Sequence, residues 1–213
     1  MEMSNPVEDR SEAVLPVKLN IGSGKDFRSD CLNLDYSDYW SPDIQVDLSR
    51  KDLVGSCFPT DRFGEVEIKH EMFDEIICND VIEHIPDLVS AMTNCLNVLK
   101  FGGKFNILVP YDLSFGAWQD PTHIRAFNER SWLYYTDWHW YLGWDQARFD
   151  MESMKYNISP IGQQLLSAGT PQDVLIRTPR AVDSMAVVLV KRELNEKDRR
   201  TLEHFRSRGT EAS

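Results

Sequence analysis

Two turns near the N-terminus carry residue types that suit the binding of a nucleoside. The stretch VKLNIGSGKDFRSDCLNLD (residues 17–35) places Gly22 and Gly24 after a short apolar run and Asp35 at the end of the next one. Glycines let the backbone approach a ligand without a Cβ, and a carboxylate after a second strand can accept hydrogen bonds from both ribose hydroxyls. The third glycine of the dinucleotide fingerprint is absent, because GSGKDF continues with Lys and Asp. On this stretch alone, two ordinary turns explain the residues as well as a nucleoside site does.

A second group of reactive side chains lies in residues 111–144, among most of the tryptophans of the chain: Asp120, His123, Arg125 and His139. Histidine titrates near pH ~6.5 and suits a general base at neutral pH. His123 is therefore the candidate base, with Asp120 orienting it or acting itself. The alternative is architectural: an Asp-Pro turn, His123 bonded to the backbone, and Arg125 paired with a carboxylate. The spacing of Asp120, His123 and His139 matches no standard metal site, so we expect no metal ion.

These side chains need a scaffold, and the hydrophobic pattern indicates an α/β protein with a parallel sheet. Strands are predicted at Val17–Ile21, Cys31–Asp35, Ile44–Asp47, Phe73–Cys78, Lys104–Val109, Phe149–Ile158 and Met185–Arg192, and an amphipathic helix at Ile85–Lys100. Residues 49–71 are rich in Gly, Pro and charge, which predicts a loop with at most a helical turn. Ligands bind beyond the carboxyl ends of the strands in such sheets. Both groups of reactive residues are expected at that edge.

Composition limits the class of protein. The chain has 213 residues, 42% hydrophobic and 27% charged, which fits one globular domain. We expect a flexible leader at 1–15, a domain at 16–192 with an aromatic lid at 111–148, and a charged tail at 193–213 that is a frayed helix or disordered. The four cysteines have neither disulfide-framework nor zinc-site spacing.

The charge and hydropathy of the chain predict its surroundings. A net charge of −11 argues against a general nucleic-acid binder. No apolar run approaches the ~20 residues of a membrane span, and the first residues lack a signal-peptide core. A cytoplasmic protein without a membrane span is therefore expected.

Six motifs occur in the order found in a known family of enzymes. They are LNIGSG (19–24), LNLDYS (32–37), DIQVDLS (43–49), FDEIICNDVIEHIPD (73–87), LNVLKFGGKFNILVP (96–110) and DPTHIRAFNERSW (120–132). In these motifs, spread over more than half of the chain, the protein resembles the class I S-adenosylmethionine-dependent methyltransferases, especially the small bacterial methyltransferase-domain type. The resemblance implies a Rossmann-like fold with a seven-stranded, mostly parallel sheet, an antiparallel last strand, and helices on both faces. It also implies S-adenosyl-L-methionine as cofactor and S-adenosyl-L-homocysteine as product.

The resemblance assigns cofactor-binding roles by position. The residues concerned are Asn20, Gly22, Ser23, Gly24, Asp35, Tyr36, Asp47, Leu48, Asn79, Asp80 and His84. Asp35 would hold the ribose hydroxyls, Tyr36 and the Asp47–Leu48 loop would meet the adenine, and Asn79 would meet the methionyl part. Asn20 stands where many members have Asp or Glu, so charge pairing with the cofactor ammonium is lost there while hydrogen bonding is kept. For His84, a role in capping or in the cofactor loop is favoured over base catalysis.

The acceptor is expected beneath the aromatic segment. Candidate catalytic residues are His123 and Asp120, and candidate substrate-binding residues are Trp118, Arg125, Tyr135 and His139. Arginine binds anionic groups, and aromatic rings stack on the apolar face of a sugar. Methyl transfer to an oxygen or nitrogen of a small-molecule or glycan-type acceptor is therefore the favoured function. The same aromatic residues are typical of a packed lid or a partner surface, which leaves a homodimer open.

Two other functions stay open. A nicotinamide-dependent oxidoreductase could use the same sheet, although the missing third glycine and the motif order disfavour it. A cofactor-binding partner subunit without catalysis would use the aromatic stretch 132–144 as its interface. The sequence also leaves open whether residues 157–183 close over the site.

Overall fold

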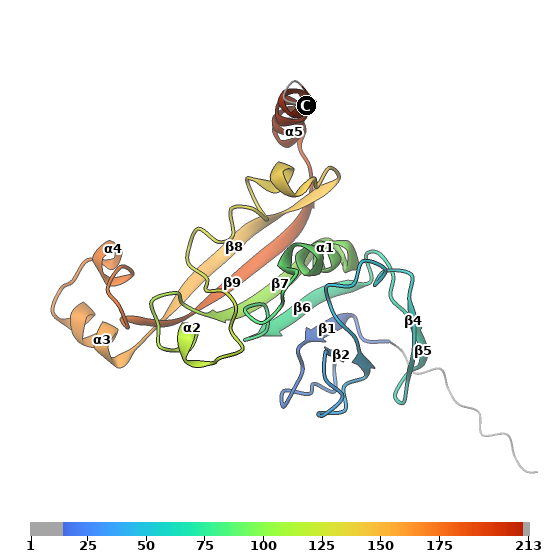
Figure 1. Ribbon diagram of the computed structural model, residues 1–213, viewed down its shortest axis with the longest axis horizontal. Coiled ribbons are helices and arrows are strands. Elements are labelled where there is room, and N and C mark those ends of the chain that lie inside the picture. Colours follow the sequence, from blue (N-terminus) through green and yellow to red (C-terminus); the bar gives the residue numbers. More distant parts are fainter. Residues whose placement is uncertain (1–14, 211–213) are drawn as a thin grey trace, which may run out of the picture.

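A mixed sheet runs through the centre of the molecule (Figure 1). The computed structural model describes residues 15–210, and within them seven strands form this sheet in the order β3-β2-β1-β6-β7-β9-β8. The strands are β1 (Lys18–Ile21), β2 (Leu32–Asp35), β3 (Ile44–Gln45), β6 (Phe73–Asn79), β7 (Leu99–Pro110), β8 (Ala147–Ile158) and β9 (Val182–Glu193). β9 runs antiparallel to both of its neighbours, β7 and β8, whereas the pairs from β3 to β7 are parallel. The predicted fold class, a mostly parallel sheet with an antiparallel last strand, is confirmed.

Alternating burial keeps the long strands in register. Along β9, Met185, Val187 and Leu189 are buried and the residues between them are half-buried. Leu189 lies opposite Phe105 of β7, which is also buried. Because side chains alternate with a period of two, a slip by one residue would turn this buried row toward the other face of the sheet. The apolar pattern therefore also fixes which residues reach the carboxyl edge.

Helix α1 (Leu88–Val98) makes the crossover from β6 to β7. Asp87 caps it, because its carboxylate accepts a hydrogen bond of 3.0 Å from the Ser90 backbone N–H. The helix is shorter than the predicted 85–100, since Leu99 is already extended and begins β7. Residues 22–31, all of them described, connect β1 to β2 without a helix. The helical cover of the sheet is thus thinner than expected.

The prediction of a loop over residues 49–71 is wrong in its second half. There β4 (Cys57–Thr60) and β5 (Gly64–Glu67) pair as an antiparallel hairpin. Val66 is fully buried and belongs to the hydrophobic core. The alternation in GEVEIKH is a strand signal that the surrounding charges and glycines obscured.

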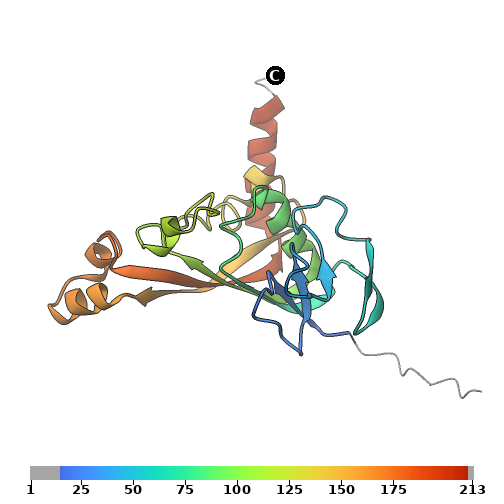
Figure 2. The same ribbon diagram turned by 60° about the horizontal axis from the view of Figure 1, so that its bottom comes forward.

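The chain after β8 forms a separate outlying unit. Helices α3 (Pro160–Ser167) and α4 (Gln172–Leu175) lie beyond one end of the β8–β9 pair, as Figures 1 and 2 both show. A Cβ on Gly162 would stand only 2.0 Å from the Ala181 carbonyl oxygen, so α3 is pressed closely against the backbone that leads into β9. Two short helices, α2 (Gly116–Gln119) and η1 (His139–Leu142), interrupt the aromatic segment.

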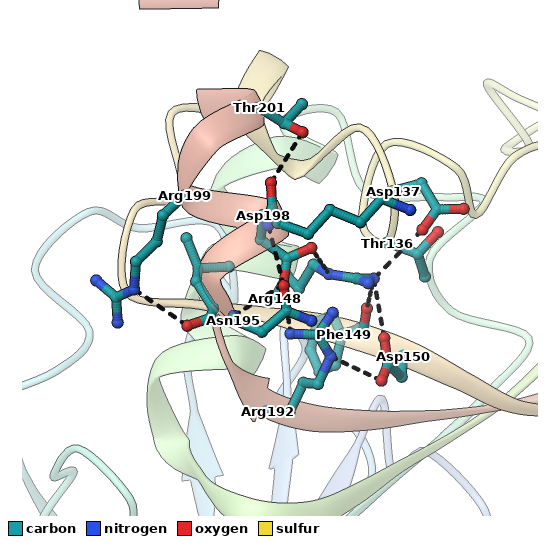
Figure 3. Close-up of polar contacts among 12 residues, drawn as sticks. Thr136, Asp137, Arg148, Phe149, Asp150, Arg192, Asn195, Asp198, Arg199 and Thr201 are labelled. Atoms are coloured by element: carbon teal, nitrogen blue, oxygen red, sulfur yellow. Dashed lines mark hydrogen bonds and ion pairs between the residues drawn. The ribbon is translucent and has the colours of Figure 1, made fainter. Parts of the chain in front are cut away.

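The charged tail is largely a docked helix, α5 (Glu196–Thr210). Asp198 in its first turn lies between Arg148 and Arg192 (Figure 3) and accepts hydrogen bonds of 3.1 and 2.6 Å from them. One turn from its end, Phe205 stacks on Trp140 with ring centroids 3.6 Å apart. Polar and aromatic contacts therefore hold both ends of the helix against the domain.

Two further predictions concern the N-terminal leader and a membrane span. The leader predicted at 1–15 lies outside the described residues except for Leu15, which packs against the core. Across residues 15–210, each helix is too short or too polar to serve as a membrane span.

Candidate active site

Two adjoining cavities open at the carboxyl edge of the sheet. The first has a volume of about 560 Å³ and is lined by the ends of β1 and β2, the Asp47–Leu48 loop and the loop after β6. The second has a volume of about 940 Å³ and extends from the glycine turn to α2 and the start of β9. Gly22, Asp80 and His84 line both cavities. A ligand that fills the first cavity therefore ends where the second begins.

The glycine turn after β1 is built for close backbone approach. Gly22 has a φ of 61°, and a Cβ there would stand 2.2 Å from Cγ2 of Val81. Glycine is thus required for both conformation and space. Asp35 at the end of β2 fixes the turn, because its carboxylate accepts hydrogen bonds from the backbone N–H groups of Gly24 at 2.8 Å and Ser37 at 2.9 Å.

Asn20 and Ser23 have different places in this turn. Asn20 is buried and donates from Nδ2 to the Asp26 carbonyl at 2.7 Å and to Asn33 Oδ1 at 3.1 Å, so it braces the turn from beneath. Ser23 lines the second cavity, and its buried hydroxyl has no hydrogen-bond partner among the described residues. A buried hydroxyl without a partner is costly, so Ser23 can serve a polar group of a ligand.

The far wall of the first cavity is a loop held from behind. Asp47 accepts hydrogen bonds from the backbone N–H and the hydroxyl of Ser49, which closes the turn. Buried Asn94 of α1 donates to the Leu48 carbonyl at 2.7 Å. Leu48 is buried and lines the cavity, and Tyr36 across from this loop is 78% exposed. This wall therefore offers an apolar surface, and the exposed Tyr36 ring lies at its rim.

His123 sits in the second cavity with one ring nitrogen committed. Its Nδ1 lies 3.1 Å from the Ala117 carbonyl oxygen, which can only accept, so Nδ1 carries the proton. In the neutral ring Nε2 then has the lone pair, and it lies 3.9 Å from Glu83 Oε1 and 4.0 Å from Asp120 Oδ2. The backbone carbonyl of α2, and not Asp120, orients the ring.

Asp120 shapes its own turn. Its carboxylate accepts hydrogen bonds from the Thr122 backbone N–H at 2.8 Å and the Thr122 hydroxyl at 2.6 Å, and these bonds lower the pKa of Asp120. It lines the second cavity as an anion. Asn79, also in that lining, lies at the end of β6.

Glu83 is the residue of this site that sequence reasoning missed. It is 1% exposed, it lines the second cavity, and both of its carboxylate oxygens lack a hydrogen-bond partner among the described residues. Burial raises the pKa of its carboxyl to about 7. The signal was present in the sequence, since Glu83 directly precedes His84 in the loop after a strand.

Asp183 and Ser184 were also missed, and they line the second cavity from the start of β9. Parallel strands bring their carboxyl ends to this edge, but an antiparallel strand brings its beginning. The residues before the run MAVVLVKR could therefore have been assigned to the site from the predicted antiparallel pairing.

The four predicted substrate-binding residues are not brought into the two cavities. Trp118 is 65% exposed and donates to the Asp112 carbonyl, and Arg125 donates to the Pro86 carbonyl at 2.8 Å. Tyr135 is buried beside Trp144. His139 is buried near Arg148 at the base of α5, where burial and the Arg148 charge lower its pKa. The architectural alternative fits these side chains better.

Comparisons with known proteins concern the fold that carries these cavities. Residues 19–107 match the family model described as "Methyltransferase domain". A search of curated proteins gave no match. Among solved structures, a SAM dependent methyltransferase from Archaeoglobus fulgidus is similar, with a TM-score of 0.52, 14% identity, and coverage of 84% of this chain and 87% of that one. An S-adenosylmethionine dependent methyltransferase from Mesorhizobium loti gives a TM-score of 0.48 at 13% identity, over 84% and 92% of the two chains.

At sequence identities this low, the similarity concerns the fold and says nothing about the substrate. The matched residues 19–107 contain the glycine turn, Asp35, the Asp47–Leu48 loop and the loop after β6, which together form the first cavity. The strand order with an inserted antiparallel β9 agrees with the fold expected from the resemblance. Residues 19–107 therefore match the model of a methyltransferase domain, and the chain has the fold of the class I S-adenosylmethionine-dependent methyltransferases.

Proposed function

We propose that the protein transfers a methyl group from S-adenosyl-L-methionine to an oxygen or nitrogen of a small-molecule or sugar-type acceptor. The observation that carries the proposal is the junction of the two cavities at Gly22, Asp80 and His84. One cavity holds the residues suited to a nucleoside, and the other holds His123. A methyl group at the junction would meet an acceptor in the second cavity.

The residues present fit this cofactor. Asp35 uses one lone pair of each oxygen on the backbone and keeps others for the ribose hydroxyls. Leu48 and Val81 offer apolar surface to an adenine in the first cavity. Ser23 and Asn79 in the second cavity offer polar groups to the methionyl part, and Ser23 has an unused hydroxyl. The cofactor has no phosphate, which agrees with a glycine turn that lacks the phosphate-binding fingerprint.

Catalysis by the chain would consist of positioning and proton removal. S-adenosylmethionine, when bound, supplies an electrophilic methyl group on its sulfonium. His123 Nε2, with its lone pair free, would accept the proton of an acceptor hydroxyl or amine. The Glu83 carboxyl 3.9 Å away would stabilise the imidazolium when ionised. The Gly22 turn and Asp35 would hold the reacting groups in line.

The first test is calorimetric binding of S-adenosylmethionine and S-adenosylhomocysteine. Asp35→Asn should weaken both affinities at least about tenfold, because it removes the charge and one acceptor that face the ribose. Asp38→Asn is the matched control, since the Asp38 side chain is exposed three residues away. Acceptor screening with His123→Gln would follow, with a loss of methyl transfer expected at unchanged cofactor affinity.

Three results would contradict the proposal. Failure of both cofactors to bind, with a reduced nicotinamide binding instead, would favour the oxidoreductase. Equal weakening by Asp35→Asn and Asp38→Asn would place the cofactor elsewhere. Tight binding with no transfer to any acceptor class would favour a non-catalytic partner subunit.

A further inference from the structure

The buried carboxylate of Glu83 is unsatisfied in either protonation state. Its side chain is 1% exposed, and neither oxygen has a hydrogen-bond partner among the described residues. An ionised carboxylate in such a position lacks a counter-charge, and a protonated one lacks an acceptor for its O–H. A cation or a hydrogen-bonding ligand in the cavity that Glu83 lines would supply the missing partner.

Two histidines present lone pairs beside this carboxylate. In His123 the proton lies on Nδ1, which faces the Ala117 carbonyl, and Nε2 is 3.9 Å from Glu83 Oε1. In His84, Nδ1 lies 2.9 Å from the Thr122 hydroxyl oxygen. That hydroxyl gives its only hydrogen to Asp120 at 2.6 Å, so it accepts from His84 Nδ1–H. In its neutral form, each ring therefore has its lone pair on Nε2.

This pattern is the one that metal-binding histidines show. Such histidines donate the other ring N–H to a carbonyl or a hydrogen-bonded oxygen, which fixes the tautomer and the ring orientation. His84 and His123 meet edge to face, with ring centroids 4.6 Å apart. Ligand-type atoms of Glu83, His84 and His123 all lie within 4.8 Å of one another.

We propose that Glu83, His84 and His123 bind a divalent transition-metal ion of the Zn²⁺ type at the junction of the two cavities. Two imidazoles and one carboxylate suit zinc and its neighbours better than Mg²⁺ or Ca²⁺, which prefer oxygen ligands. Tetrahedral zinc with bonds of about 2.1 Å holds its ligand atoms roughly 3.4 Å apart. The Glu83–His123 separation of 3.9 Å is close to that value, and the three ligand atoms all lie within 4.8 Å of one another.

Three protein ligands leave the fourth coordination position of the ion open toward the cavity. Three protein ligands with an open position are typical of catalytic zinc sites, whereas structural sites have four. Asp120 Oδ2, 4.0 Å from His123 Nε2, adds a negative charge at the rim that favours a cation. An oxygen of an acceptor, or water, would complete the coordination.

The consequence for chemistry rests on the proposed function. With the metal bound, His123 Nε2 is a ligand and no longer a free base. A hydroxyl of the acceptor on the metal would lose its proton more readily, because the ion lowers the pKa of a bound O–H. The acceptor would then be an oxygen nucleophile that enters the second cavity and binds the ion directly.

The test is metal binding to the whole chain, measured without cofactor or acceptor. After dialysis against a chelator, the protein is titrated with Zn²⁺ by calorimetry and with Co²⁺ by visible absorption, in a Cys57→Ser background because Cys57 is exposed. One ion per chain is expected. Glu83→Gln and His123→Gln should each weaken binding at least about tenfold. His70→Gln, which alters an exposed histidine outside the cluster, should leave it within about twofold.

Thermal unfolding separates loss of the site from loss of the fold. Zn²⁺ should raise the midpoint of the parent and of His70→Gln by similar amounts, and that of Glu83→Gln by clearly less. The proposal would be overturned if the parent did not bind one Zn²⁺ per chain, or if Glu83→Gln bound Zn²⁺ with the same affinity as the parent. Because the assay uses no S-adenosylmethionine, a failure of metal binding is distinct from a failure of cofactor binding.

Discussion

At the scale of single residues, the site depends on a few residues whose type or orientation is fixed by their neighbours. Gly22 is fixed by the neighbouring Val81, Asp35 by two backbone N–H groups, and His123 by the Ala117 carbonyl. The types and positions of Gly22, Asp35 and His123 were readable in the sequence. The pairing of His123 with Glu83 was not, because it depends on how residues 116–123 fold back over the loop after β6.

Replacing Gly22 tests the close approach of backbone and side chain. Gly22→Ala should destabilise the fold by about 1–3 kcal/mol and weaken cofactor binding, since its Cβ would clash with Val81 at a positive φ. Gly64→Ala is the matched control, because Gly64 has a φ of 70° with nothing within 4 Å of a Cβ. Denaturant unfolding measures both.

The double variant Gly22→Ala/Val81→Ala distinguishes crowding from backbone strain. Removing the Val81 methyl groups should restore part of the lost stability, because they are the atoms that the new Cβ meets. Equal losses in Gly22→Ala and Gly64→Ala, with no recovery in the double variant, would assign the whole effect to the positive φ.

At the scale of elements, the docking of α5 on β8 is where sequence reasoning reached least far. The run MAVVLVKR predicted a strand, but the buried Arg148 and the docking of α5 come from contacts between segments about 50 residues apart. Tyr135 and His139 were expected near a substrate because their types suit one, yet packing beneath the aromatic segment and α5 buries both. Residue type alone does not tell an aromatic lid from an aromatic core.

The docking of α5 can be tested at Asp198. Asp198 and Asn195 exchange reciprocal side-chain to backbone hydrogen bonds at the helix start, and Asp198 also joins Arg148 and Arg192. Asp198→Ala should cost roughly 1–3 kcal/mol, because buried Arg148 loses one carboxylate partner while it keeps Asp150. Glu203→Gln, on the exposed side of the same helix, should change stability by less than about 0.5 kcal/mol. Urea unfolding followed by tryptophan fluorescence compares the two.

At the scale of the whole molecule, the order of the motifs predicted the arrangement of the sheet. The ion pairs of Asp198 with Arg148 and Arg192 contribute to the stability of the protein in acid. Burial alone would raise the pKa of Asp198, but hydrogen bonds from Arg192 and the Asn195 backbone and the charge of Arg148 outweigh it and lower the pKa to about 2. A carboxyl whose pKa is lower in the folded state than in the unfolded chain stabilises the fold at pH values above its unfolded pKa.

The acid limb of the stability curve follows from this shift. Asp198 should contribute about 2 kcal/mol that is complete above pH ~4 and is lost as the pH falls toward ~2. The measurement is the free energy of unfolding from pH 6 down to about 2 in the parent and in Asp198→Asn. Parallel curves for the two proteins would show that this carboxyl is not part of the acid response.

The antiparallel strand β9 has a practical consequence for handling the protein. Asp183 and Ser184 near its start line the second cavity, and its other end, Glu193, is followed closely by α5. Eleven residue steps at about 3.4 Å separate the two ends by roughly 37 Å. A chain anchored to a sensor chip or resin through α5 would thus hold its cavities away from the support, open to small molecules in the flowing solution.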